Sequence, residues 1–141
     1  MTVPTIDHVG IVVQALEPAV ETLRRLLPGA ALVRRSLPAV GLEVAEFQAA
    51  NISIELLQYT GPADDLAHRA MGAEPGLNHL SIAVRNLDDA LNGLAAQGVA
   101  PIEGFPCRGS HGRIAFLPPD ACSALRIELC QPDEPAGVQH D

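Results

Sequence analysis

Asn78-His79-Leu80-Ser81-Ile82-Ala83-Val84 is a second version of an earlier stretch, Asp7-His8-Val9-Gly10-Ile11-Val12-Val13. A shift of 71 residues, the separation of His8 and His79, keeps matching residue types beyond both stretches, through an expected turn and helix. Agreement over several elements is typical of an internal duplication. The sequence therefore predicts two copies of one module, each with a histidine near the start of its first strand.

The two copies also end alike, with Ser53-Ile54-Glu55-Leu56-Leu57-Gln58 in the first and Arg126-Ile127-Glu128-Leu129-Cys130-Gln131 in the second. In both, a glutamate stands between aliphatic residues on an expected strand, where a buried, unpaired carboxylate would be costly. Taken singly, such a histidine or glutamate is usually an ordinary core or surface residue. Because both recur in each copy, we predict one shared site made of His8, Glu55, His79 and Glu128.

Two imidazoles and two carboxylates form a mixed nitrogen and oxygen ligand set. Such a set suits a divalent ion such as Co, Mn, Ni, Zn or Fe(II), and the residue types do not choose among these metals. Strands of a curved sheet can point all four side chains at one concave face. An octahedral ion held by four protein ligands keeps two positions for water or a bidentate substrate.

The order of predicted elements repeats as well. Hydrophobic periodicity, Pro and Gly predict strand, helix and three strands in each copy. The ranges are 6–13, a helix from 17 to about 27, 31–36, 41–47 and 52–57, then 78–84, a helix over 88–97, 99–103, 113–117 and 124–130. We expect an α+β fold in which two tandem βαβββ modules form a curved mixed sheet with a central metal cup. In one domain over 1–141, module 1 spans 5–60, a linker with a short helix 61–76, module 2 77–132 and a tail 133–141.

Composition excludes several classes of protein. With 141 residues, 48% of them hydrophobic, the chain suits one domain, and no apolar run approaches the roughly 20 residues that span a bilayer. Its start lacks the basic region of a signal peptide, so we expect a cytoplasmic protein with no membrane partner. A net charge of -8 disfavours nucleic acid. The absence of lysine excludes Schiff-base and phosphate-loop lysines, and the unpaired number of cysteines (Cys107, Cys122, Cys130) indicates reduced thiols.

Four segments carry a family resemblance. Residues 6–11, 76–80, 111–120 and 125–131 resemble the vicinal oxygen chelate superfamily, and within it the methylmalonyl-CoA epimerases most closely. The resemblance implies a divalent metal at His8, Glu55, His79 and Glu128, although some epimerases have glutamine where this chain has Glu55. It also implies an epimerase or racemase that removes a proton from a 2-methyl-malonyl-CoA-type thioester and stabilises the enolate with the metal. Glu128 would then be a base as well as a ligand.

The second catalytic base is expected on the strand that pairs with the Glu55 strand, at Glu43 or Glu46. The shift of 71 residues takes Glu43 to Ile114, which has the pattern of an inward residue, so Glu43 would face the cup. A two-residue turn at Ala50-Asn51 would instead place Glu46 opposite Glu55. From the repeat we favour Glu43.

Other features leave alternatives open. His111 is typical of a loop histidine, although its Gly-rich loop could close over an acyl group. If the small-molecule substrate is an acyl-CoA, Arg34, Arg35, Arg108 and Arg113 are the expected phosphate contacts, with solubility as the alternative role. The rival functions are a glyoxalase-type lyase or isomerase acting on a thiol adduct and a non-enzymatic binding module for a small molecule such as an antibiotic. Pairing into a homodimer is expected by analogy with related proteins.

Overall fold

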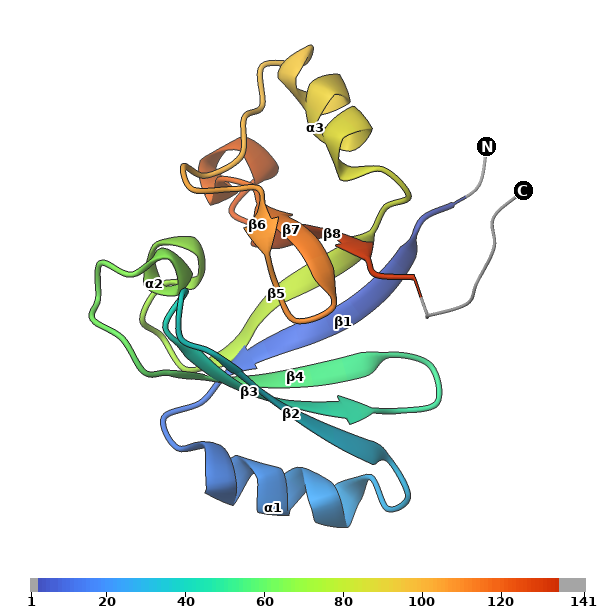
Figure 1. The fold of residues 1–141 in the computed structure, drawn as a ribbon, viewed down its shortest axis with the longest axis vertical. Helices are drawn as coiled ribbons and strands as arrows, with labels where there is room; N and C mark the ends of the chain where they lie inside the picture. The colour runs from blue at the N-terminus through green and yellow to red at the C-terminus, as the bar shows by residue number, and fades with distance from the viewer. Residues whose placement is uncertain (1–2, 135–141) are drawn as a thin grey trace.

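The computed structural model describes residues 3–134, so most of the expected tail at 133–141 lies outside the described residues. The elements follow in the order β1 (Thr5–Val12), α1 (Leu16–Leu26), β2 (Ala31–Leu37), β3 (Leu42–Gln48), β4 (Ser53–Tyr59), α2 (Leu66–Met71), β5 (Gly76–Ala83), α3 (Leu87–Ala95), β6 (Cys107–Arg108), β7 (Gly112–Phe116), a 3-10 turn (Pro119–Cys122) and β8 (Ile127–Pro132). Each half runs strand, helix, strand, strand, strand, with α2 between the halves (Figure 1).

All eight strands form one curved sheet in the order β2-β3-β4-β1-β5-β8-β7-β6. The two halves join where β1 and β5 pair antiparallel, and within the halves β1 pairs parallel with β4 and β5 with β8. The predicted α+β fold with a curved mixed sheet is confirmed. The strands that carry the repeated histidines and glutamates, β4, β1, β5 and β8, are the four central neighbours of this sheet.

Helices α1 and α3 cover the outer face of the sheet, one on each half (Figure 1). From α1, Val20 packs with Ala45 and Phe47 of β3, and from α3, Leu87 packs with Ala115 of β7. Both buried helix residues continue the periodicity seen in the sequence. The third cluster of buried residues is inside the cup, where Met71 and its neighbours on α2 pack near β3, β4 and β7.

The second half departs from the prediction at its second strand. The predicted strand at 99–103 is wrong, because the segment 99–106 forms no strand and the position is filled by the two-residue β6. Pro101 and Pro106 lack the N–H that a sheet ladder needs, and Gly104 has a φ of 101°. The predicted loop around 106–112 therefore contains the strand.

The last strand also begins later than predicted. Residues 124–126 precede β8, since Ser123 and Ala124 have φ values of 56° and 66° and a left-handed backbone cannot continue a β-ladder. Their left-handed turn follows the 3-10 turn at Pro119–Cys122.

Membrane insertion finds no support in the helices of the described part of the chain. None of them combines the length and the hydrophobicity needed to cross a bilayer. All three cysteines, Cys107, Cys122 and Cys130, carry free thiols, which agrees with their odd number in the sequence.

Candidate metal centre and active site

Four central strands bring the repeated residues into one cavity. His8 comes from β1, Glu55 from β4, His79 from β5 and Glu128 from β8, and these side chains are only 3 to 6% exposed. His8 Nδ1 lies 3.3 Å from Glu55 Oε2, and His8 Nε2 lies 3.2 Å from Glu128 Oε1. The rings of His8 and His79 have centroids 5.7 Å apart. Residues up to 120 positions apart in the chain are therefore neighbours in the cup.

The β1–β5 pairing explains how His79 fits against the sheet. Gly10 of β1 is the register partner of His79, and a Cβ atom added at Gly10 would collide with the imidazole ring. The ring can lie over the β1 backbone because glycine has no side chain there. On its other side the ring meets Phe116 edge-on, with centroids 4.9 Å apart. Glycine and phenylalanine thus fix the plane of this imidazole.

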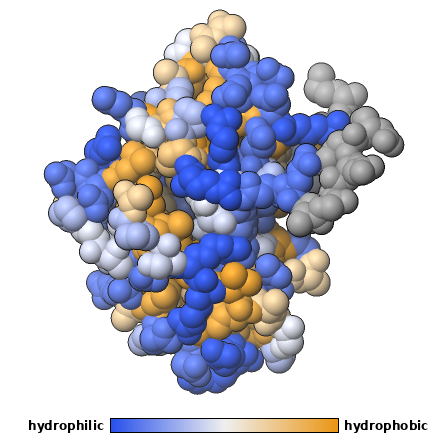
Figure 2. Space-filling view, viewed as in Figure 1, coloured by the Kyte–Doolittle hydropathy of each residue, from blue (hydrophilic) through white to orange (hydrophobic). Residues whose placement is uncertain are grey.

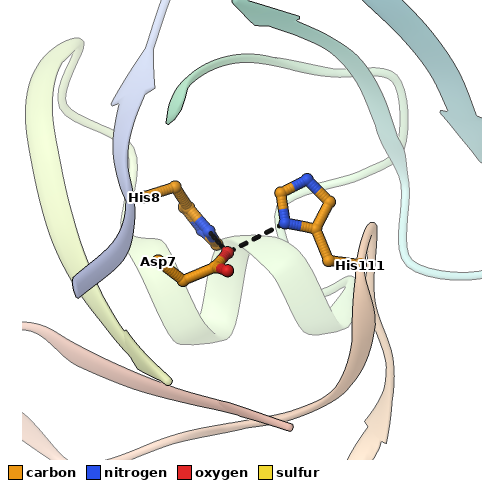
Figure 3. Close-up of side chains that lie close together, drawn as sticks. All are labelled: Asp7, His8 and His111. Carbon is orange, nitrogen blue, oxygen red and sulfur yellow. Dashed lines mark hydrogen bonds and ion pairs between the residues drawn. The ribbon is translucent and has the colours of Figure 1, made fainter. Parts of the chain in front are cut away.

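An Asx residue stands directly before each repeated histidine and accepts a hydrogen bond from it. Asp7 Oδ2 lies 2.7 Å from His8 Nδ1, and Asn78 Oδ1 lies 2.8 Å from His79 Nδ1. Asp7 Oδ2 also lies 2.8 Å from Nδ1 of His111, so one carboxylate holds two rings (Figure 3). Holding Nδ1 in this way turns the other ring nitrogen, Nε2, toward the carboxylate cluster.

Glu46, not Glu43, faces the cup. Glu46 is 1% exposed, is the register partner of Glu55, and forms a short ion pair with His111 Nε2. Glu43 is half-buried on the other face of β3 and accepts a 2.6 Å hydrogen bond from the Ser36 hydroxyl. The expectation that Glu43 points into the cup is therefore wrong.

The reason lies in the offset between the two halves. Glu46 pairs with Glu55 in the first half as Phe116 pairs with Glu128 in the second, so β3 and β7 are related by a shift of 70 residues. The first strands are related by 71. A difference of one residue moves every side chain of a strand to the opposite face. The turn at 50–51, closed by the hydrogen bond from Ala49 N to Ile52 O, was the more reliable guide.

The two histidines beside Asp7 are held as cations by the carboxylates around them. Burial alone would lower the pKa of His8, but hydrogen bonds to Asp7 and Glu128 raise it to about 10. Hydrogen bonds to Asp7 and Glu46 likewise raise the pKa of His111 to about 10. Each pair of opposite charges stabilises the other inside the low-dielectric cup.

The remaining groups divide according to their partners. Burial lowers the pKa of His79 to about 4 and therefore keeps this imidazole neutral. Burial also raises the pKa of Glu55. Burial opposes ionisation of Glu46 and Glu128 too, but nearby histidines outweigh it and lower both pKa values, that of Glu46 to about 2. Ser81 Oγ donates a 2.5 Å hydrogen bond to Glu128 Oε1 and adds to this effect.

The donor atoms fit a bound divalent metal ion. Within residues 3–134, the buried atoms His8 Nε2, Glu55 Oε2 and His111 Nε2 make no hydrogen bond, although carboxylates or imidazoles lie at ion-pair distance. Leaving a buried polar atom unsatisfied costs about 1–3 kcal/mol. A cation that takes their lone pairs would remove this cost.

Two groups of ligand atoms are close enough to share such an ion. The first is His8, His79 and Glu128, and the second is Glu46, Glu55 and His111, with the atoms of each group within 4.8 Å of one another. The predicted fourth ligand, Glu55, therefore groups with the second set and touches the first through His8.

The cluster opens into a cavity of about 540 Å³ that is partly exposed to solvent. This volume is in the range of small-molecule sites. Apart from the cluster, its walls are mainly apolar and come from the turn before β3, from α2 and from Phe105 and Phe116. Figure 2 shows hydrophobic side chains reaching the surface around α2, beside a hydrophilic band across the middle of this face. The cavity thus joins a polar, charged region to an apolar wall.

The four arginines expected to contact phosphates all form ion pairs with carboxylates. The pairs are Arg34 with Glu17, Arg35 with Glu46, Arg108 with Asp133, and Arg113 with Asp88. Of the four, Arg108 lines the cavity. A phosphate group would have to displace a carboxylate to use any of them.

Fold, strand order and cluster together define a vicinal oxygen chelate protein. The chain belongs to the Glyoxalase/Bleomycin resistance protein/Dioxygenase superfamily, whose sequence profile matches residues 7–117. The uncharacterized protein YqjC of Bacillus subtilis (strain 168) is 32% identical over 138 residues, which cover 96% of both chains.

Two solved structures have the same fold over nearly the whole chain. The hypothetical protein BH1468 from Bacillus halodurans C-125 superposes with a TM-score of 0.81 and 23% identity, covering 97% of this chain and 100% of that one. Methylmalonyl-CoA epimerase from Mycobacterium tuberculosis superposes with a TM-score of 0.79 and 27% identity, covering 95% and 94%.

Several residues of the cluster escaped the sequence analysis. Asp7 and Asn78 were quoted with the repeat but given no role, although an Asx before each histidine was a visible signal. Ser81 stands two residues after His79, where period-two alternation puts both side chains on one face. The position of His111 beside Asp7 could not be found in this way, since the two are 104 residues apart.

Proposed function

We propose that this protein is a divalent-metal-dependent epimerase or racemase that exchanges the proton beside a carbonyl group of a 2-methyl-malonyl-CoA-type thioester. One observation carries the proposal: three imidazoles and three carboxylates are buried around one cavity, and a carboxylate, Glu46, stands outside the histidine and glutamate triad suited to a metal. Similarity to a methylmalonyl-CoA epimerase at 27% identity supports this choice of reaction and substrate.

The proposed ligands are His8, His79 and Glu128, with Glu55 as the fourth. When bound, a divalent ion supplies Lewis-acid stabilisation of the negative charge that develops on the carbonyl oxygen. The hydrogen bonds of Asp7 and Asn78 to the histidine Nδ1 atoms keep both Nε2 atoms directed at the site. The identity of the metal stays open among Co, Mn, Ni, Zn and Fe(II).

Glu46 is the proposed base that takes the proton from the substrate. Arg35 Nη1 donates a 3.0 Å hydrogen bond to its Oε1, and His111 holds its Oε2. With these partners its pKa is about 2, which favours the carboxylate but makes a weak base. A substrate oxygen that becomes the partner of His111 in place of Glu46 would raise this pKa. We therefore expect substrate binding itself to activate Glu46.

Glu128 is the proposed second proton carrier. It lies on β8, whereas Glu46 lies on β3, and β4, β1 and β5 separate these two strands in the sheet. Two carboxylates on opposite sides of a substrate can remove a proton from one face and return one to the other. Ser81 holds Glu128 from the same side.

A glyoxalase-type reaction on a thiol adduct is the second candidate. The ion pairs of the four arginines favour it, because a substrate smaller than coenzyme A needs no phosphate contacts. A carboxylate at Glu55, where some epimerases have glutamine, also fits this alternative. A purely binding role for a small molecule such as an antibiotic is less well supported, since all four proposed ligands are present.

Proton exchange in deuterated water separates these functions. Purified protein reconstituted with each divalent metal is incubated with methylmalonyl-CoA or with a hemithioacetal, and deuterium at the reacting carbon is followed by NMR. Deuterium at C2 of the thioester, abolished by a chelator, supports the epimerase. Turnover of the hemithioacetal alone would replace it by the glyoxalase-type function, and metal binding without either reaction would favour a binding module. Pairing of two copies and cytoplasmic location stay predictions.

A further inference from the structure

The two Asx residues before the proposed metal-binding histidines differ in what else they bind. Asp7 spends its second contact on another ring, that of His111. Asn78 instead donates from Nδ2 to the backbone oxygen of Met71, at 2.7 Å. Met71 is the last residue of α2. One amide therefore joins His79 to the end of a helix in the linker between the two halves.

This arrangement fixes the orientation of the Asn78 amide. Its nitrogen must face the Met71 carbonyl, because that oxygen can only accept a hydrogen bond. Its oxygen must then face His79, at 2.8 Å from Nδ1. His79 consequently carries its proton on Nδ1 and presents the lone pair of Nε2 to the site, as a metal ligand requires.

Helix α2 is a wall of the cavity. Leu66, Ala67, Ala70 and Met71 all line it. The carbonyl end of α2 is held by two further side chains, since Arg126 Nη1 donates to Ala70 O at 2.5 Å and Tyr59 Oη donates to Gly72 O at 2.5 Å. Neither of these hydrogen bonds involves a proposed metal ligand, so Asn78 differs from both in reaching the wall and the site at once.

We propose that Asn78 is a positioning residue that couples the cavity wall α2 to the metal ligand His79. The inference rests on the metal site of the proposed function and adds a link between that site and the substrate wall. Coupling of two binding events is reciprocal. A bound metal, by fixing His79, therefore holds α2 in place, and an ordered α2 strengthens metal binding.

Substitutions can separate the two ends of the amide. Asn78→Asp keeps an oxygen acceptor for His79 but loses the donor to Met71. Asn78→Ala loses both contacts. Tyr59→Phe is the matched control, because it removes a different hydrogen bond to the end of α2 and leaves His79 and its partner unchanged.

Two measurements are needed on each purified full-length protein. Metal affinity is measured by competition with a chelator for Co²⁺. Hydrogen exchange is followed at the amides of residues 69–72, with and without Co²⁺, since the Arg69 and Gly72 amides donate within α2. Circular dichroism confirms that each variant is folded, and Asn78→Ser replaces Asn78→Ala if the latter is not.

In wild type, Co²⁺ should slow exchange of the α2 amides. Asn78→Ala should weaken Co²⁺ binding by about 10- to 100-fold, the usual loss when the partner of a metal-binding histidine is removed. Asn78→Asp should bind Co²⁺ as well as wild type or better, but Co²⁺ should no longer slow α2 exchange. Tyr59→Phe should speed α2 exchange by about 5-fold, the loss of one hydrogen bond, with the slowing by Co²⁺ retained.

Two results would overturn the inference alone: Asn78→Ala with wild-type Co²⁺ affinity, or Asn78→Asp in which Co²⁺ slows α2 exchange as in wild type. Failure of wild type to bind Co²⁺ or any other divalent ion tested would remove the proposed metal site and this inference together. A protein that binds the ion and shows the coupling, but exchanges no substrate proton, would keep the inference and reject the epimerase function.

Discussion

Changing Glu46 to glutamine should abolish the proposed proton exchange, whereas the same change at Glu43 should leave it nearly intact. The two residues lie three positions apart on β3, so their side chains point to opposite faces of the sheet. A glutamine cannot accept the substrate proton, and we expect Glu46→Gln to lower the exchange rate by about 10²- to 10⁴-fold, the usual contribution of a general base.

The structure also gives the expected effects on stability. Glu46→Gln replaces charged hydrogen bonds with Arg35 and His111 by neutral ones inside a buried cluster, which should cost about 1–3 kcal/mol of unfolding free energy. At Glu43 the amide oxygen of glutamine can still accept from Ser36, so the change should stay within about 0.5 kcal/mol.

The assay is deuterium incorporation at C2 of methylmalonyl-CoA, with metal content measured in the same samples of wild type and both variants. Urea unfolding gives the stabilities. Glu46→Gln with full exchange at normal metal content would refute the assignment of the base. Loss of exchange in Glu43→Gln, with metal and stability unchanged, would show that the half-buried face of β3 takes part in the reaction.

Three further predictions test the metal centre. Glu128→Ala should leave the protein without its ion after gel filtration, and metal analysis that finds as much ion as in wild type would count against the site. Gly10→Ala should weaken Co²⁺ binding at least 10-fold because its methyl group displaces the His79 ring, the order of effect expected when a ligand is misplaced; unchanged affinity would contradict the close packing. In the metal-free protein, the pKa of His8 is about 10, above its ordinary 6.5, so its stabilisation is complete below pH 6.5 and is lost as the pH rises through 10. The urea midpoint of chelator-treated protein should therefore fall between pH 7 and 10, and a rising midpoint would be inconsistent with this ion pairing.

The duplicated stretches explain why so much of the fold could be predicted from the sequence. The strands around His8, Glu55, His79 and Glu128 are short runs of β-branched and aliphatic residues, and their repetition identified the two halves without any knowledge of the pairing. Prediction failed at 99–103, where the residue types suit a strand but the prolines interrupt its hydrogen bonding.

The acidic residue that faces the cup depended on register. A repeat offset of 71 at the first strands becomes 70 between β3 and β7, because the loops of the two halves differ in length, and this single residue exchanges Glu43 for Glu46. Nothing in the local sequence of β3 distinguishes the two glutamates.

The sequence by itself determined the modules, the helices and the four repeated polar residues, because periodicity and duplication are properties of the chain. Only the tertiary structure decided the register of β3 and the partners that surround those residues. Asp7 binds His111 across 104 residues, and Asn78 binds the end of α2, because curvature of the sheet and packing of the linker bring these groups together. Such contacts arise from the folded arrangement of distant segments, and no spacing within the sequence encodes them.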